Sequence, residues 1–226
     1  MAEIIDKNTW PRREAYDFFA RMSWPFYALT FPVDVTRLRG WCRREGASFY
    51  PAMVYGVTKA MERVDAFHYK DRGGQIVRVK RLVPSFTDLH PGSEQFHIVT
   101  LEAGEDLADF CRRAKEKSAA QTAFISSGPW EEDELVYFSC LPWFPLTAAT
   151  NERDADPADS IPRVTWGRWQ EDAGRTTLHL SLELNHRLLD GAHAGMFYRE
   201  LEGWMKFSYN WSRCIVLYPP ILCRAI

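Results

Sequence analysis

The segment that decides the fold reads TLHLSLELNHRLLDG and spans residues 177–191. Leucines recur at every second position from Leu178 to Leu184, which is the period of a strand with one buried face. Asp190-Gly191 interrupts this run, and apolar residues then recur at helical spacing. The sequence therefore predicts a packed strand, a tight turn and a helix, with His186 where the strand ends.

A histidine in this position is held from behind by a packed strand, while its ring faces whatever lies beyond the strand end. Imidazole exchanges protons near neutral pH, so such a residue suits general acid–base catalysis. A structural histidine with all its hydrogen bonds made inside the core is the alternative interpretation. The strand pattern alone leaves both open.

The composition favours a globular protein. The 226 residues are 46% hydrophobic and carry a net charge of −2, so we expect one domain over residues 1–226. Without a basic block or a run of about 18 apolar residues, neither nucleic acid nor a membrane is expected as a partner. Residues 1–7 do not read as a signal peptide. The odd number of cysteines, five, without C-x-x-C spacing, predicts reduced thiols, a cytoplasmic location and no metal site.

The rest of the chain reads as strands and helices in irregular order, which predicts a two-layer α/β sandwich. Residues 151–159 are acidic and are expected to form the most exposed loop. A turn is expected at 171–174, and the tail after Phe207 is difficult to place, although 215–218 could be a strand. Helices are expected at 8–22, 36–44, 49–64 and 106–119, and strands at 26–35, 67–70, 75–79, 85–88, 96–101, 135–140 and 163–169.

Four separated segments resemble motifs of chloramphenicol acetyltransferases, a branch of the CoA-dependent acyltransferase superfamily. These segments are WPRRE at 10–14, FYP at 49–51, SCLPW at 139–143 and NHRLLDG at 185–191, in the family's order. Thr165 also falls at the family's spacing before the histidine. The resemblance implies the family's fold, in which a mixed β-sheet is layered with helices.

The resemblance also implies a reaction, the transfer of acetyl from acetyl-CoA to a hydroxyl of chloramphenicol, with antibiotic resistance as its consequence. His186 would be the general base through Nε2, with its other ring nitrogen held by the residue's own backbone carbonyl. Ser139 would donate a hydrogen bond to the oxyanion, and Thr165 would orient the intermediate through a bound water. Asp190 would form a buried ion pair with Arg12 that shapes the turn.

Binding positions carry over in the same way. The resemblance implies CoA contacts at Tyr50, Arg168 and Trp169, and a homotrimer in which the base of one subunit faces the pocket of its neighbour. The positions implied for the acceptor pocket are Phe18, Phe19, Leu29, Ser85, Thr87, Phe96, Ile98 and Tyr137.

Several residues depart from the family's pattern. Asn185 replaces the first of two paired histidines, which makes the segment similar to D-H-R-x-x-D-G-A of dihydrolipoyl acyltransferase cores. Phe19, Ser85 and Tyr137 replace a usual Tyr, a frequent Gln and a usual Asn. Three alternatives therefore stay open: a different hydroxyl acceptor, a dihydrolipoyl-acyltransferase-like core, and a non-catalytic binding homologue.

Overall fold

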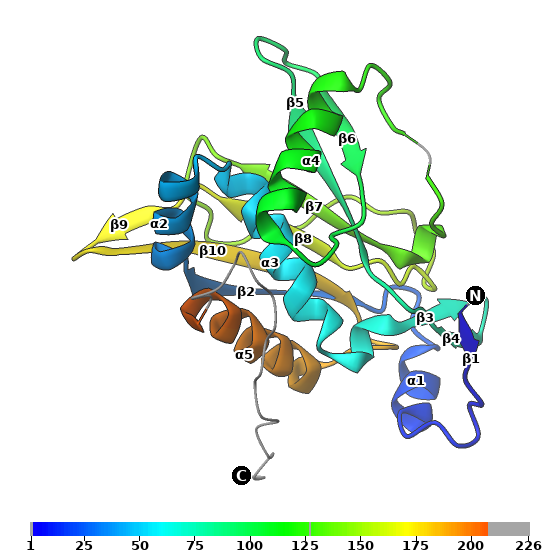
Figure 1. Ribbon diagram of the computed structural model, residues 1–226. Helices are drawn as coiled ribbons and strands as arrows, with labels where there is room; N and C mark the ends of the chain where they lie inside the picture. The colour runs from blue at the N-terminus through cyan, green and yellow to red at the C-terminus, as the bar shows by residue number, and fades with distance from the viewer. Residues whose placement is uncertain (1, 127, 208–226) are drawn as a thin grey trace.

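The structure, a computed structural model, describes residues 2–126 and 128–207. Within these residues a seven-stranded sheet forms one layer of the fold (Figure 1). β7 runs parallel to both β5 and β8, and every other pair in this sheet is antiparallel, so the predicted mixed sheet is confirmed. Its strands, in spatial order, are β2 (Phe26–Asp34), β10 (Arg175–Asn185), β8 (Arg163–Gly167), β7 (Leu135–Leu141), β5 (Val83–Leu89) and β6 (Phe96–Thr100), with β9 (Gln170–Asp172) paired to β10.

Helices cover one face of this sheet (Figure 1). The covering helices are α2 (Thr36–Glu45), α3 (Phe49–Glu62), α4 (Leu107–Ala120) and α5 (Gly191–Phe207), and the short 3₁₀ helices are η1 (Asp65–His68) and η2 (Glu132–Glu134). α1 (Arg13–Phe19) lies at one end, beside a small sheet of β1 (Glu3–Ile4), β4 (Gln75–Arg78) and β3 (Tyr69–Arg72). The predicted two-layer α/β sandwich is therefore confirmed.

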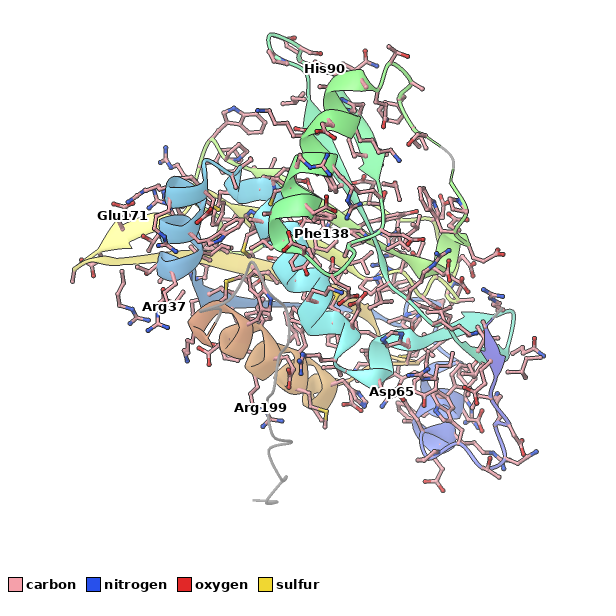
Figure 2. The ribbon with its side chains drawn as sticks, in the orientation of Figure 1. Arg37, Asp65, His90, Phe138, Glu171 and Arg199 are labelled. Atoms are coloured by element: carbon pink, nitrogen blue, oxygen red, sulfur yellow. The ribbon has the colours of Figure 1, made fainter. Side chains whose placement is uncertain are left out.

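The core lies between the sheet and the helices. The alternating leucines of β10, from Leu178 to Leu184, are at most 2% exposed, as their period predicts. Phe138 of β7 is also 2% exposed and lies near the centre of the molecule (Figure 2). His90, in the connection between β5 and β6, lies at the edge of the same view. No helix among the described residues is long and apolar enough to cross a membrane.

The other face of the sheet is polar. Strand register places Thr30, Ser181, Thr165 and Ser139 side by side across four neighbouring strands. Because directly opposite residues project to the same side of a sheet, these four hydroxyls share one face. The Thr30 and Ser181 hydroxyl oxygens are 2.8 Å apart.

The segment 144–161 crosses this polar face. The backbone N–H of Ala149 donates to Ser181 Oγ at 2.9 Å. A Cβ on Gly167 would lie 2.6 Å from the backbone nitrogen of Leu146, so only glycine allows this close approach.

The prediction that 151–159 is the most exposed loop is wrong. The side chain of Arg153 is 1% exposed and that of Asp159 is 12% exposed. These two charges pair with each other, and Arg153 also faces Glu183 of β10. An acidic, irregular composition predicts solvent exposure only when the charges lack partners, and here the partners come from other elements.

Three predicted boundaries also change. The helix expected at 8–22 is confined to α1, because Arg12 is its N-cap and the Asp6 side chain accepts the N–H of Asn8 in a preceding turn. Residues 67–68 belong to η1 and residues 170–172 to β9, so the turn after β9 is reduced to Ala173–Gly174. The strand expected at 215–218 lies outside the described residues.

Candidate active site

His186 directly follows β10, and contacts from two other elements hold its position. Its backbone N–H donates to the carbonyl of Pro25 at 2.7 Å. Its ring stacks on Phe19 of α1, with centroids 3.9 Å apart, and lies 4.4 Å from the ring of Tyr27 on β2. The half-buried imidazole is therefore held between two aromatic side chains.

The expected contact between the imidazole and the residue's own carbonyl is absent. His186 Nδ1 is buried and has no hydrogen-bond partner among the described residues. The His186 carbonyl instead accepts a hydrogen bond from Arg12 Nη2 at 2.8 Å. That carbonyl bonds the arginine while the ring makes no hydrogen bond to it, so the predicted contact is corrected.

Arg12 also binds the turn after His186. Its Nη1 lies 2.5 Å from Asp190 Oδ2, and its Nε donates to the carbonyl of Arg187 at 3.2 Å. The expected Arg12–Asp190 ion pair is thus present, but it is only partly buried, because the Asp190 side chain is 35% exposed. Burial acts to raise the pKa of Asp190, yet hydrogen bonding and charge from Arg12 and His193 bring it below its usual range.

A second ion pair beside this turn was not predicted. Arg187 Nη1 lies 3.2 Å from Asp71 Oδ2, and the Asp71 side chain is 1% exposed. Tyr16 Oη donates to the same carboxylate oxygen at 2.8 Å, and Arg187 Nη2 donates to the carbonyl of Ala20. The charge of Arg187, next to His186, was the only feature of the sequence that pointed to this ion pair. Its partner could not be identified, because Asp71 lies more than a hundred residues away in the chain.

Ser139 and Thr165 are directly opposite each other on the parallel strands β7 and β8. Ser139 is half-buried, whereas Thr165 is 2% exposed. The hydroxyl of Thr165 donates to Oδ1 of Asn151 at 2.9 Å. Asn151 was not among the predicted site residues, since it lies in the loop that was expected to be exposed.

Within one chain the structure does not bring His186 and Ser139 together. Thr165 lies between Ser139 and Ser181 in the strand register. Asn185 then lies four residues beyond Ser181, which is roughly 13 Å along a strand. His186 and Ser139 therefore occupy different parts of the sheet.

The predicted acceptor-pocket residues divide in the same way and do not form one cluster within a single chain. Phe19 stacks on His186, Phe18 contacts Phe19, and Leu29 lies on the face of β2 that carries Tyr27. The remaining positions lie on the strands around Ser139. They are Ser85 and Thr87 on β5, Phe96 and Ile98 on β6, and Tyr137 on β7.

The predicted CoA contacts meet where β8 ends. Trp169 packs against Phe49 with centroids 5.0 Å apart, and the guanidinium of Arg39 lies 4.3 Å from its ring. Tyr50, next to Phe49, is half-buried, but its hydroxyl is buried, and this burial raises the pKa of the hydroxyl well above the usual value. Arg168 is exposed beside Trp169, so a cation and aromatic side chains gather at one place.

Comparison with known proteins identifies the family. The model of the family described as chloramphenicol acetyltransferase matches residues 2–202. The chain belongs to the chloramphenicol acetyltransferase family. A chloramphenicol acetyltransferase from Campylobacter coli is 25% identical over 88% of this chain and 95% of its own length. Chloramphenicol acetyltransferase 2 from Escherichia coli is 26% identical over 88% of this chain and 94% of its own.

Solved structures agree on the fold. A structure titled chloramphenicol acetyltransferase matches with a TM-score of 0.81 and 22% identity, over 91% of this chain and all of that one. The cubic core of the pyruvate dehydrogenase multienzyme complex matches with a TM-score of 0.60 and 18% identity, over 84% of each chain. The second likeness shows the fold alone, so the dihydrolipoyl acyltransferase alternative gains no functional support from it.

Proposed function

We propose that this member of the chloramphenicol acetyltransferase family transfers acetyl from acetyl-CoA to a hydroxyl of chloramphenicol. The observation that carries the proposal is the pairing of Ser139 with Thr165 on adjacent strands, beside the exposed cation Arg168. His186 supplies a base on a separate part of the molecule. Family membership over residues 2–202 supports both the reaction and the acceptor.

In the proposed reaction His186 is the general base. The stacking on Phe19 and the contact with Tyr27 restrict rotation of the ring, so its Nε2 keeps one direction. Nε2 accepts the proton of the acceptor hydroxyl as the oxygen attacks the thioester carbonyl. The same nitrogen returns the proton to the departing thiolate, and general acid–base catalysis of this kind contributes about 10²–10⁴-fold.

Ser139 stabilises the negative charge that develops on the carbonyl oxygen. A single preorganised donor of this kind contributes about 3–4 kcal/mol to transition-state stabilisation. Thr165, opposite Ser139, holds a water against the same oxygen. Both residues act on charge that exists only during the reaction, so they raise kcat rather than tighten substrate binding.

The residues present fit acetyl-CoA as the co-substrate. Tyr50 Oη is buried with no partner in hydrogen-bonding geometry within the described chain. Such a group suits a ligand that carries amides. The exposed guanidinium of Arg168 suits its phosphates.

The proposal includes a homotrimer, because one chain separates its base from its oxyanion donor. A second copy would place its Ser139 and Thr165 against the first copy's His186. Cyclic assemblies repeat one such heterologous contact until the ring closes. The proposed location is the cytoplasm, which suits Cys42, Cys111 and Cys140, three thiols outside any disulfide in the described chain.

The test is release of free CoA from acetyl-CoA in the presence of chloramphenicol. We expect chloramphenicol-dependent release by the wild type and a loss of about 10²-fold or more in His186→Ala. The half-buried His179→Ala, on the same strand but remote from the ring of His186, is the matched control and should keep wild-type rates. No release by the wild type with chloramphenicol would reject this acceptor.

One observation favours a second candidate, the same reaction on a different hydroxyl acceptor. Ser85 stands at a predicted pocket position, but its Oγ is 2.8 Å from Thr100 Oγ1 and is engaged there. The guanidinium of Arg163 lies over the ring of Tyr137, 5.4 Å from the ring centroid. A panel of other alcohols and thiols tests this candidate, and acetylation of one of them with none of chloramphenicol would establish it. A wild type that neither releases CoA nor binds it would instead be the non-catalytic homologue, which binds another ligand or partner with the same fold.

A further inference from the structure

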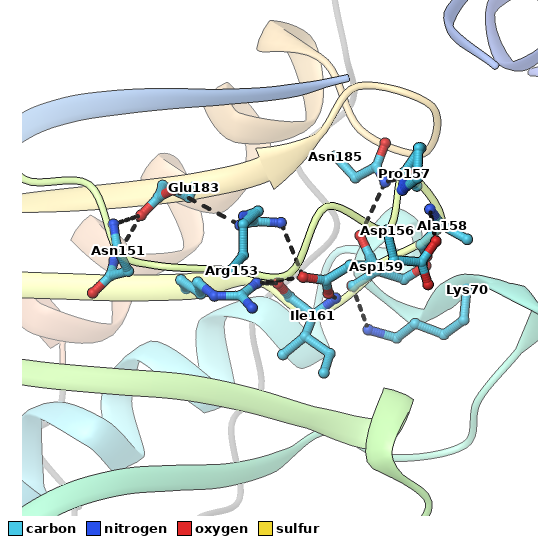
Figure 3. Close-up of polar contacts among 12 residues, drawn as sticks. Lys70, Asn151, Arg153, Asp156, Pro157, Ala158, Asp159, Ile161, Glu183 and Asn185 are labelled. Carbon is cyan, nitrogen blue, oxygen red and sulfur yellow. Dashed lines mark hydrogen bonds and ion pairs between the residues drawn. The ribbon is translucent and has the colours of Figure 1, made fainter. Parts of the chain in front are cut away.

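Asn151 connects two strands of the polar face through three hydrogen bonds. Its Oδ1 accepts from Thr165 Oγ1 of β8 at 2.9 Å. Its side-chain Nδ2 and its backbone N–H both donate to Glu183 Oε1 of β10, at 2.6 Å and 2.5 Å (Figure 3). Every polar atom of this side chain thus has a partner inside the protein.

The direction of these hydrogen bonds is fixed by chemistry. A carboxylate only accepts hydrogen bonds, so the amide nitrogen of Asn151 must face Glu183 and its oxygen must face Thr165. An amide oxygen also only accepts, so Thr165 must donate its single hydroxyl proton to Asn151. The lone pairs of Thr165 Oγ1 are then all that it offers to another partner.

The loop that carries Asn151 is held along the length of β10. Arg153 Nη1 lies 3.2 Å from Asp159 Oδ2, and Arg153 Nη2 lies 3.8 Å from Glu183 Oε2 (Figure 3). Asn185 Nδ2 donates to the carbonyls of Pro157 and Asp159 at 2.8 Å and 2.9 Å. The Arg153 side chain is 1% exposed, so the loop cannot shift without exposing a buried charge network.

We propose that Asn151 is a positioning residue that sets the direction of the Thr165 hydroxyl during acetyl transfer. This inference rests on the proposed function, in which a water on Thr165 contacts the oxyanion. With the Thr165 proton committed to Asn151, this water donates one proton to Thr165 Oγ1 and points the other at the oxyanion. A Thr165 released from Asn151 can donate to the water instead, which leaves the water free to turn.

Asn151→Leu tests this assignment, because leucine has a similar volume and no polar atom. We expect kcat to fall about five- to tenfold, the effect of one hydrogen bond, while KM for acetyl-CoA and for the acceptor stay unchanged. Glu152→Gln changes the exposed neighbour in the same loop and should retain the wild-type kcat. A rise in KM at constant kcat, or wild-type kinetics in Asn151→Leu, would overturn the inference.

Asn151→Asp keeps an acceptor for Thr165 and places its second oxygen against Glu183. We expect its kcat, relative to that of Asn151→Leu, to recover as pH is lowered and one of the two carboxyl groups takes a proton. Arg153 is the cation that faces this pair, so its charge is constant over the same range. Parallel pH profiles for the two variants would indicate a merely structural role and would reject positioning.

A double-mutant cycle between Asn151→Leu and Thr165→Val measures the coupling energy between the two side chains and does not depend on enzyme activity. The free energies of unfolding should be non-additive, because either substitution alone removes the shared hydrogen bond. Additive effects would refute the contact and the inference with it. An inactive wild type with a non-additive cycle would reject the proposed function while supporting the geometry assigned to Asn151.

Discussion

Two arginines fix the turn that carries His186. Arg12 donates to the carbonyls of His186 and Arg187 and pairs with Asp190. The Arg187 side chain pairs with Asp71. Because Nδ1 of His186 has no hydrogen-bond partner in the described part of the chain, these backbone contacts and the flanking aromatic rings determine the position of the imidazole.

Removal of the Arg187 charge should destabilise the protein strongly. Arg187→Met leaves the carboxylate of Asp71, 1% exposed, without its cation, and we expect a loss of about 3–5 kcal/mol in the free energy of unfolding. Urea denaturation measures this loss. Arg112→Met is the control, since the Arg112 side chain is 58% exposed in its ion pairs and its replacement should leave the free energy of unfolding near the wild-type value. Similar losses in the two variants would show that the Arg187–Asp71 pair is not a buried interaction.

The buried Lys70 should make stability depend on pH. Its Nζ donates to the carbonyl of Ser160, and burial lowers its pKa to about 8. An unfolded lysine titrates near 10.4, so between pH of about 8 and about 10 only the unfolded chain holds this proton, and stability rises with pH. Urea denaturation across this range should show that rise, and Lys70→Met should flatten it. Identical pH dependence in the two proteins would exclude Lys70 as its source.

At the scale of elements, the contact between α3 and α5 depends on one residue without a side chain. A Cβ on Gly56 of α3 would overlap the ring of Trp204 on α5. The helical period predicted both helices, but it gives no information on which residues meet where they pack. A glycine inside a helix lowers helix propensity, and here the close approach of the indole explains it.

Gly56→Ala should therefore destabilise the protein although alanine is the better helix former. Overpacking against Trp204 costs about 1–3 kcal/mol, which outweighs the gain in helix propensity. Gly195→Ala is the matched control, because a Cβ at Gly195 on α5 meets nothing within 4 Å among residues 2–126 and 128–207. That variant should gain up to about 1 kcal/mol. Thermal unfolding of both variants should give shifts of opposite sign, and a stabilised Gly56→Ala would show that the ring moves aside freely.

At the scale of the whole molecule, the two halves of the proposed active site lie in different places. His186, Phe19 and Tyr27 form one group where β10 ends. Ser139 and Thr165 form the other on β7 and β8, near the predicted CoA contacts. In the proposed function a neighbouring copy therefore completes each site.

Mixed oligomers test this requirement. His186→Ala subunits should be inactive alone, and Ser139→Ala subunits should lose about 10²–10³-fold. Co-expressed, they should regain roughly one quarter of wild-type activity, because a site between an intact Ser139 and an intact His186 forms at about that frequency. Activity in the mixture that does not exceed the mean of the separate variants would place the whole site within one chain.

The sequence by itself determined the fold class, the family and most of the strands and helices, because periodicity and turn residues are local signals. It also indicated His186 and Ser139, each within a short motif, and Thr165 by its spacing before His186. Only the tertiary structure decided what surrounds them. Arg12 donates to the His186 carbonyl, Arg187 pairs with Asp71, and Thr165 donates to Asn151. The loop 151–159 shows the physical reason, since its charges are buried by partners that are distant in the chain. The energy of such contacts depends on which side chains meet in space, and no pattern within one segment contains that information.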